Sequence, residues 1–336
     1  MIEKAIGKLV DNVHLTADEA EEVMDQIMNG DATEAQIGGY LVALRMLGES
    51  PDEIAGSVRS MRSKSTKIKT SHPHVVDVVG TGGDGTNTFN ISTTTALIVS
   101  ATGQPVAKHG NRSVSSNSGA ADVLKELGVN IEISSEKVGA CLDEVGIAFL
   151  FAPLLHGAMK HAIGPRRELA MRSIFNVMGP LTNPANAQTL LVGVYSEMLT
   201  ELIADVLSKL DCQRAFVVHG LDGMDEITLC DSTKVSEWDG VQVRTYNITP
   251  EDFGFQKVES KELLGGNPEE NAQITRRILN GEKGAKRNIV LMNVSATLLV
   301  SGKVDNFLEG VNLASETIDN GDAGKKLDQL IEVTNS

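Results

Sequence analysis

The sequence predicts an α/β protein in which a small all-helical domain precedes a large domain with a mainly parallel central sheet. Two observations predict it. Residues 1–70 carry only helical patterns, and from residue 75 onward short β-branched runs alternate with helical ones. The length of 336 residues allows roughly two domains at ~150 residues each. We expect the domains at residues 1–70 and 71–336, with segment 165–185 packing on the helical domain or forming the hinge.

Sequence motifs in the first domain predict the N-termini of three helices. Residues 16–19 read TADE, a capping box in which Thr16 caps and Glu19 reaches back, and Gly30 is the expected stop. Residues 33–36 form a second capping box, and Gly48 is expected to end the helix that follows it. Residues 50–53 form the third start, with Pro51 at the first helical position. The polar and basic stretch 62–71 is predicted to be a linker.

The second domain is predicted from short apolar runs that read as buried strands. These runs are residues 75–79, 106–107, 147–151, 190–194, 215–218 and 289–292. Helical patterns follow at residues 120–127 and 199–210, and a terminal helix is expected at 322–336. Residues 231–265 read as irregular or short-stranded.

Composition excludes several classes of protein. Thirty Lys and Arg against 45 Asp and Glu give a formal charge of −15, which argues against a general binder of nucleic acid or of anionic membranes. An odd number of widely spaced cysteines, three in all, argues against a disulfide scaffold and suits a reducing cytoplasm. No apolar span of ~20 residues is present in the sequence, so no membrane segment is expected.

The first chemical motif is the glycine-rich stretch GTGGDGTNTFNIST at residues 80–93. It begins where a strand should end and enters a helix expected to start near Ser92. Glycines let backbone N–H groups approach an anion, and a helix N-terminus adds a positive dipole end. Asn90, Ser92 and Thr93 add phosphate-oxygen or metal partners. The alternative is a tight turn without a ligand.

The second motif, KHGNRSVSSNSGAAD at residues 108–122, also follows a strand and precedes a helix. It gathers Lys108, Arg112, an amide and four hydroxyls in one loop. In an acidic protein this local set favours an anionic ligand such as phosphate or pyrophosphate. A solvated loop with a capping serine is the alternative.

Two further motifs carry charged residues that could bind ligands: one contains an arginine that can pair with a carboxylate, and the other contains two carboxylates that can bind a metal ion. Residues 161–184 contain Arg166 in a Gly-Pro-Arg-Arg stretch expected to form a turn, and a guanidinium can pair with a carboxylate. Asp225 and Glu226 follow a strand in a glycine-rich turn, a donor set that suits Mg²⁺. Taken singly, surface salt bridging and an exposed acidic turn are the better interpretations. Together, the strand-end loops predict a site for a Mg²⁺-diphosphate substrate at the carboxyl edge of the sheet.

The motifs GTGGDGTNTFNIST, KHGNRSVSSNSGAADVLKELG, RSIFNVMGPLTNPA and HGLDGMDEIT resemble those of the anthranilate phosphoribosyltransferase family over essentially the whole chain. The resemblance implies the nucleoside phosphorylase/phosphoribosyltransferase fold, a homodimer, two Mg²⁺ ions per subunit and no nucleic-acid or membrane partner. It implies phosphoribosyl pyrophosphate (PRPP) as donor, the amine of anthranilate as acceptor, and pyrophosphate release. That reaction is the second step of tryptophan biosynthesis from chorismate.

The resemblance also assigns residues to sites. For PRPP it implies Gly80, Gly83, Asp84, Thr88, Asn90, Ile91, Ser92, Thr93, Lys108, His109, Gly110, Asn111, Arg112, Ser113, Val114, Ser115, Ser116 and Ala120. Many relatives carry a serine where Ala120 stands. For anthranilate it implies Gly80, Asn111 and Arg166, with His109, His156 and Pro180 as outer contacts. For metal it implies Ser92, Asp225 and Glu226.

Two other functions remain open at this stage. A pyrimidine nucleoside phosphorylase-like enzyme shares the architecture, but its expected Lys-x-Ser-Gly-Arg core differs from Lys108–Arg112 here. A non-catalytic, nucleic-acid-binding relative is disfavoured by the charge of −15 and by the intact Asp225–Glu226 pair.

Overall fold

A bundle of four helices forms the N-terminal part of the computed structural model, which describes residues 1–112 and 118–336. The helices are α1 (Ile2–Val10), α2 (Ala17–Asn29), α3 (Glu34–Leu47) and α4 (Pro51–Lys64). All three predicted capping boxes are confirmed. Helix α4 continues to Lys64, so the linker predicted at 62–71 is wrong in its first three residues, which extend the helix by most of a turn.

Close packing of α2 and α4 depends on a glycine. A Cβ added to Gly56 would lie 1.9 Å from the carbonyl oxygen of Ala17, so a side chain at this position would force the two helices apart. The buried Glu53 completes this contact, because its carboxylate accepts the N–H of Leu15 at 2.9 Å and that of Ser50 at 2.7 Å. A buried carboxylate is tolerated here because backbone donors satisfy it.

The sheet has seven strands within the described residues, in the order β3-β2-β1-β4-β5-β6-β7. They are β1 (Val76–Gly80), β2 (Val106–Gly110), β3 (Ile147–Phe151), β4 (Thr189–Gly193), β5 (Arg214–Gly220), β6 (Thr233–Trp238) and β7 (Val243–Ile248). The first five are mutually parallel. Strand β6 runs antiparallel to β5, and β7 runs antiparallel to β6. The chain winds from β1 toward β3 on one side and from β4 toward β7 on the other. The topological switch therefore lies between β1 and β4.

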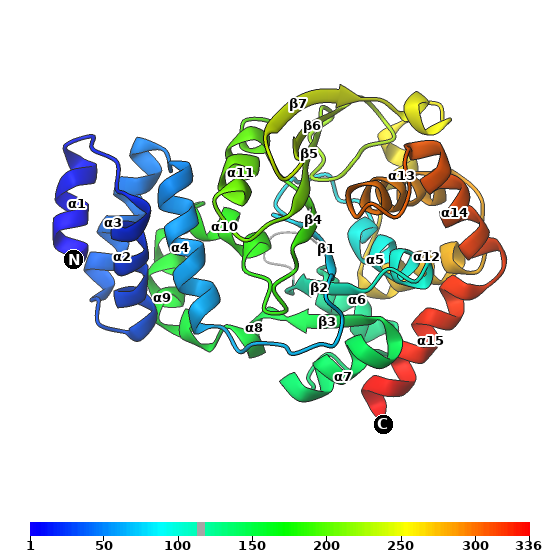
Figure 1. Cartoon of the computed structure of the whole chain (residues 1–336), viewed down its shortest axis with the longest axis horizontal. Coiled ribbons are helices and arrows are strands. Elements are labelled where there is room, and N and C mark those ends of the chain that lie inside the picture. Colours follow the sequence, from blue (N-terminus) through cyan, green and yellow to red (C-terminus); the bar gives the residue numbers. More distant parts are fainter. Residues whose placement is uncertain (113–117) are drawn as a thin grey trace.

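Helices cover both faces of the sheet (Figure 1). One face carries α5 (Ile91–Ala101), α12 (Pro268–Leu279), α13 (Ala285–Val300), α14 (Phe307–Asp319) and α15 (Asp322–Asn335). The strand predicted at 289–292 is wrong, because those residues lie inside α13. They are buried on all sides, and a short apolar run of this kind fits a buried helix as well as a strand. On the same face, α6 (Ala120–Glu126) packs against α12. Helices α7 (Ser135–Val145) and α11 (Leu199–Ser208) lead into β3 and β5.

The chain returns to the N-terminal bundle after β3. Helices α8 (Ala152–Leu155), α9 (Lys160–Leu169) and α10 (Ile174–Met178) precede β4, and α9 packs against α2 and α3 (Figure 1). Backbone hydrogen bonds join the segment after α4 to this return, from Thr66 N–H to the Leu155 carbonyl at 2.8 Å and from Ile68 N–H to that of Pro184 at 3.1 Å. No helix among residues 1–112 and 118–336 combines the length and apolarity that a membrane crossing requires.

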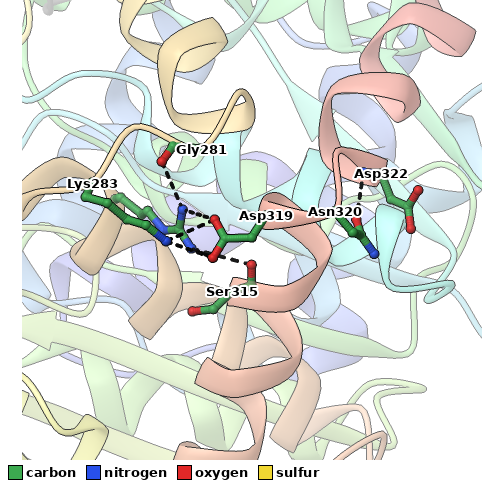
Figure 2. A network of polar contacts seen from close by, with 7 residues as sticks. Gly281, Lys283, Ser315, Asp319, Asn320 and Asp322 are labelled. Atoms are coloured by element: carbon green, nitrogen blue, oxygen red, sulfur yellow. Dashed lines mark hydrogen bonds and ion pairs between the residues drawn. The ribbon is translucent and has the colours of Figure 1, made fainter.

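A charged network ties α13 to α14 at the far end of the molecule (Figure 2). The Arg287 side chain, only 3% exposed, donates to both carboxylate oxygens of Asp319 at 2.6 and 2.9 Å, and to the carbonyls of Gly281 and Ser315. Lys283 adds a second, exposed cation to Asp319 at 2.7 Å. These hydrogen bonds hold the pKa of Asp319 well below its usual range.

Asp319→Asn is expected to lower the free energy of unfolding by about 1.5–3 kcal/mol, because it leaves a buried guanidinium without its anion. Asp322→Asn, which removes the exposed pair with Lys325, is the matched control and should change stability by less than about 0.5 kcal/mol. Denaturant titration of both variants measures the difference. Equal losses in the two variants would contradict the assignment.

Candidate functional site

The site is built where β1 and β4 end side by side, at the switch point of the sheet. Gly80 and Gly193 are the paired last residues of these strands. A Cβ on Gly193 would lie 1.6 Å from the carbonyl oxygen of Asp225, and one on Gly80 would lie 2.6 Å from its Oδ2. The two glycines therefore admit the turn after β5 to the carboxyl edge of the sheet, where ligands bind in open α/β folds.

The first glycine-rich motif and the carboxylate pair meet at this edge. The N–H of Gly82 donates to Asp225 Oδ2 at 2.7 Å, and the N–H of Ser92, at the start of α5, donates to Glu226 Oε1 at 3.2 Å. Residues 143 and 134 positions apart in the sequence are thereby brought into contact. The convergence that the strand-end motifs predicted is present in the structure.

Lys108 lies beneath both motifs, although it belongs to β2. Its buried Nζ donates to the carbonyl of Val78 at 2.7 Å and to Ser92 Oγ at 3.3 Å. Burial lowers the pKa of this lysine, and the nearby carboxylates of Asp77, Glu226 and Asp225 oppose that effect. The second motif thus supplies a cation to the loop formed by the first.

The carboxylates outnumber this cation. Burial and the neighbouring Asp84 raise the pKa of Asp225 to about 7, and burial together with Asp225 raises that of Glu226 well above its usual value. Raised carboxyl pKa values mean that the ionised cluster is short of positive charge. Within the part of the chain described, no three His, Cys, Asp or Glu side chains group closely enough to hold a metal alone. The set fits Mg²⁺, which uses one or two carboxylates and completes its shell with water and substrate phosphates.

The other residues of the first motif differ in burial and in their hydrogen-bond partners. The side chains of Ile91 and Thr93 are buried, and the Thr93 hydroxyl has no hydrogen-bond partner among the described residues. The N–H of Ile91 donates to the carbonyl of Phe89 at 2.8 Å. The Asn90 side chain is engaged by Ser118 at 3.1 Å and by Asn271 at 3.0 Å. Gly83, Asp84 and Thr88 are half-buried in the loop itself.

Beyond Lys108 and His109, the described residues of the second motif make local and surface contacts. Asn111 Oδ1 accepts the N–H of Arg112 at 2.7 Å, and the Arg112 guanidinium donates to Glu132 at 3.1 Å on the surface. Gly110 ends β2 beside Phe149 and Ala120, which opens α6. The predicted site residues Ser113, Val114, Ser115 and Ser116 lie outside the described residues.

A second group of predicted residues gathers on the opposite face of β2. Because side chains alternate along a strand, His109 points away from the face that carries Lys108. His109 Nε2 lies 3.2 Å from Nε2 of His156, which follows α8, so one ring nitrogen of the pair donates and the other accepts. His109 also forms a hydrogen bond with the backbone of Gly179, which precedes the buried Pro180.

Sequence reasoning missed the polar pair that holds these residues. Asp77 is fully buried on β1 and accepts the N–H of His109 at 3.1 Å and the amide of Asn183 at 2.7 Å. Asn183 donates in addition to the carbonyl of Ala107 at 2.8 Å. The available signal was a lone aspartate inside an apolar strand, since a buried carboxylate requires partners.

Arg166 lies in a helix, and the predicted Gly-Pro-Arg-Arg turn is wrong. Residues 160–169 form α9 with Pro165 inside it, and the helix ends at Ala170 in the left-handed conformation. The Arg166 guanidinium lies 4.8 Å from the ring centre of Phe175, and burial lowers its pKa. Arg167 is exposed on another face of the helix.

Comparison with known proteins agrees with both parts of the fold. Residues 3–65 match the helical bundle domain of a glycosyl transferase family, and residues 72–324 match the family's a/b domain. Anthranilate phosphoribosyltransferase from Acetivibrio thermocellus is 54% identical over 336 residues, covering 100% of this chain and 97% of that protein. The enzyme from Geobacter sulfurreducens is 53% identical over 351 residues, with full coverage of both chains.

Solved structures give the same result. Anthranilate phosphoribosyltransferase from Thermus thermophilus superposes with a TM-score of 0.94 at 40% identity, covering 99% of each chain. The Saccharomyces cerevisiae enzyme in complex with PRPP and Mg superposes with a TM-score of 0.90 at 28% identity, covering 99% of this chain and 98% of that one.

The fold and the site therefore define a glycosyl transferase with a helical bundle domain and an a/b domain. Within that class, the chain belongs to the anthranilate phosphoribosyltransferase family. Neither the nucleoside phosphorylase alternative nor the nucleic-acid-binding one is favoured by these relatives.

The histidine pair predicts a loss of stability in acid. Burial lowers the pKa of His109 to about 3 and that of His156 to about 4, so both are neutral in the folded protein at pH 5. The unfolded chain binds protons at these positions below pH ~6.5, so the pair's contribution to stability falls as the pH drops from there toward 4. Each histidine contributes a loss of roughly 1–2 kcal/mol between pH 7 and 5.

Denaturant unfolding of the wild type and of His156→Gln at pH 7, 6 and 5 tests this expectation. The variant should lose less stability on acidification than the wild type does. His74→Gln, which removes an exposed histidine, should keep the wild-type dependence. A His156→Gln profile parallel to that of the wild type would contradict the prediction.

Proposed function

We propose that this chain transfers the phosphoribosyl group of PRPP to the amine of anthranilate, giving N-(5-phosphoribosyl)anthranilate and pyrophosphate, as the second step of tryptophan biosynthesis. The observation that carries the proposal is the meeting of an anion-binding glycine loop, a buried lysine and a carboxylate pair at the switch point of the sheet. The related yeast enzyme is described in complex with PRPP and Mg, and also with 4-fluoroanthranilate, which supports both substrates.

The donor is assigned to the face of the sheet that carries Lys108. Backbone N–H groups of Gly83 and Asp84 in the loop, and of Thr93 in the first turn of α5, would supply hydrogen-bond donors for phosphate oxygens. Lys108 Nζ supplies a fixed positive charge beneath them. Stabilisation of the departing diphosphate is the largest contribution expected, since charge develops there as the bond at the anomeric carbon breaks.

Two Mg²⁺ ions per subunit are proposed to bind with PRPP. Asp225, Glu226 and Ser92 would hold them, and Mg²⁺ supplies charge neutralisation of the diphosphate. These three residues are already held in place by the loop, through the N–H of Gly82 and the N–H of Ser92 itself. The protein's contribution is to keep the carboxylates gathered despite their mutual repulsion.

The acceptor is assigned to the same carboxyl edge of the sheet, beside the donor, so that its amine can reach the anomeric carbon. An aromatic amine is neutral at pH 7, so the nucleophile needs positioning more than a strong base. Arg166 would pair with the anthranilate carboxylate, Asn111 and Gly80 would contact it, and His109, His156 and Pro180 would form the outer wall. A fluorescence assay of anthranilate consumption with PRPP and Mg²⁺ tests the activity. Turnover of thymidine with phosphate instead would overturn the proposal.

The metal assignment predicts the behaviour of Asp225→Asn combined with Glu226→Gln. Loss of both ligands should lower kcat/KM for PRPP by about 10²–10³-fold and raise the Mg²⁺ requirement. Thermal stability at pH 8 should be unchanged or higher, because two crowded charges are removed. Asp231→Asn, at a surface pair with Lys257, is the control. An unchanged Mg²⁺ dependence in the double variant would refute the assignment.

The acceptor assignment predicts a contrast between adjacent arginines. Arg166→Ala should raise the KM for anthranilate roughly 10–100-fold through loss of a charge-assisted contact, with the KM for PRPP nearly unchanged. Arg167→Ala should change neither constant, because its side chain is exposed elsewhere on α9. Steady-state kinetics with each substrate varied distinguishes them. The reverse pattern would place the acceptor elsewhere.

A homodimer is proposed through the helical bundles, with the cytoplasm as the compartment; the three unpaired cysteines suit a reducing environment. Val10 on α1 and Met46 on α3 are 67% and 83% exposed on helices that pack together. Met46→Glu should shift the protein toward monomer in sedimentation velocity. Met198→Glu, at an equally exposed methionine before α11, should not. A monomeric wild type at micromolar concentration would refute the interface.

A further inference from the structure

Arg172 links the segment that returns from the helical bundle to the glycine-rich loop at residues 80–85. It lies between α9, which packs against α2 and α3, and α10. Its Nη donates to the carbonyl of Gly83 at 2.6 Å, so a segment outside the α/β core touches the glycine-rich motif directly. None of the roles assigned above includes this arginine.

The same guanidinium stacks on an aromatic ring that is tied to the same loop. The Arg172 guanidinium carbon lies 3.8 Å from the ring centre of Tyr195, just after β4. The N–H of Tyr195 donates to Thr81 Oγ1 at 3.0 Å, and the N–H of Thr81 donates to the carbonyl of Gly193 at 2.9 Å. Arg172 therefore holds the loop at two points, at Gly83 directly and at Thr81 through Tyr195.

This loop needs such support more than an ordinary turn does. Gly82, Gly83 and Gly85 have φ angles of +66°, +76° and +75°, and glycine backbones lose the most conformational freedom on ordering. The N–H of Gly82 also holds Asp225 Oδ2. A contact that fixes the loop therefore fixes both the phosphate donors and one metal-binding carboxylate.

We propose that Arg172, in the segment between α9 and α10, is a positioning residue that preorganises the PRPP loop by its hydrogen bond to Gly83 and its stack on Tyr195. The inference rests on the proposed donor site. Without the arginine, the loop must be ordered by PRPP itself, and that ordering free energy is lost from donor binding. The residues proposed to contact anthranilate include neither Gly83 nor Tyr195, so we expect the KM for anthranilate to depend less on this arginine.

The test measures both KM values, kcat and calorimetric PRPP binding with Mg²⁺ for a set of variants. Arg172→Ala should weaken PRPP binding and raise its KM roughly 10-fold, with the KM for anthranilate much less affected. Arg172→Lys, which keeps a donor but not the planar stack, should fall between this variant and the wild type. Arg167→Ala, at an exposed arginine of the same segment, is the matched control.

Substitutions of Tyr195 test the stacking of Arg172 on its ring separately from the hydrogen bond to Gly83. Tyr195→Leu should reproduce part of the Arg172→Ala effect, and Tyr195→Phe, which keeps the ring face, should restore it. The double variant Arg172→Ala/Tyr195→Leu should be no worse than Arg172→Ala alone, because both changes break one unit. Melting temperatures identify any variant that fails merely by unfolding.

The outcomes separate this inference from the proposed function. An active wild type with unchanged PRPP binding in Arg172→Ala, or fully additive effects in the double variant, would overturn the role of Arg172 alone. A wild type without activity on PRPP and anthranilate would overturn the proposed function. A loss confined to kcat, with both KM values unchanged, would also contradict preorganisation of the donor loop.

Discussion

A buried lysine among buried carboxylates is the interaction on which this site depends. Lys108 comes from β2, and Asp225 and Glu226 come from the turn after β5; all three lie around the first turn of α5. One fixed cation does not balance the carboxylates, as the raised pKa values of Asp225 and Glu226 indicate. Gathering these buried carboxylates therefore carries an electrostatic cost, which a divalent cation would relieve.

Backbone geometry keeps those charges together. Four parallel strands end on glycine at one edge of the sheet, namely Gly80, Gly110, Gly193 and Gly220. At Gly80 and Gly193 a side chain would occupy the space of Asp225. The missing side chains of these two glycines therefore admit the turn that carries Asp225. The winding of the sheet places this edge at its switch point.

Strand β2 presents polar side chains on both of its faces. Lys108 and His109 are adjacent in sequence, yet the lysine meets the donor loop and the histidine meets His156. Asp77 and Asn183 fix this strand from β1 and from the segment that returns from the bundle. Under the proposed function the amine must reach the anomeric carbon directly, so both substrates must meet beyond the carboxyl ends of these strands and not on opposite faces of the sheet.

Much of the fold and part of the site could be predicted from sequence, for identifiable physical reasons. Capping boxes and glycine stops are local signals, and they placed α2, α3 and α4 correctly apart from the end of α4. Residues 289–292 could not be placed, because a helix buried on all sides has no polar face to reveal its period. The convergence of Gly82 with Asp225 followed from strand-end logic.

The sequence could not predict which distant residues certain polar side chains contact. Asp77, Asn183 and Arg172 act through contacts with residues 32 to 106 positions away, and no local pattern encodes which residue each will meet. Arg166 was placed in a turn because proline and glycine precede it. Tertiary packing of α9 on the bundle overrides that local preference.

The measurement that tests the central claim most directly is an anomalous-diffraction map of crystals grown with PRPP and Mn²⁺ in place of Mg²⁺. The charge imbalance predicts manganese bound to the carboxylates of Asp225 or Glu226, with the diphosphate against the loop that begins at Gly80. Manganese peaks away from both carboxylates, with PRPP ordered in the crystal, would contradict this account of the site.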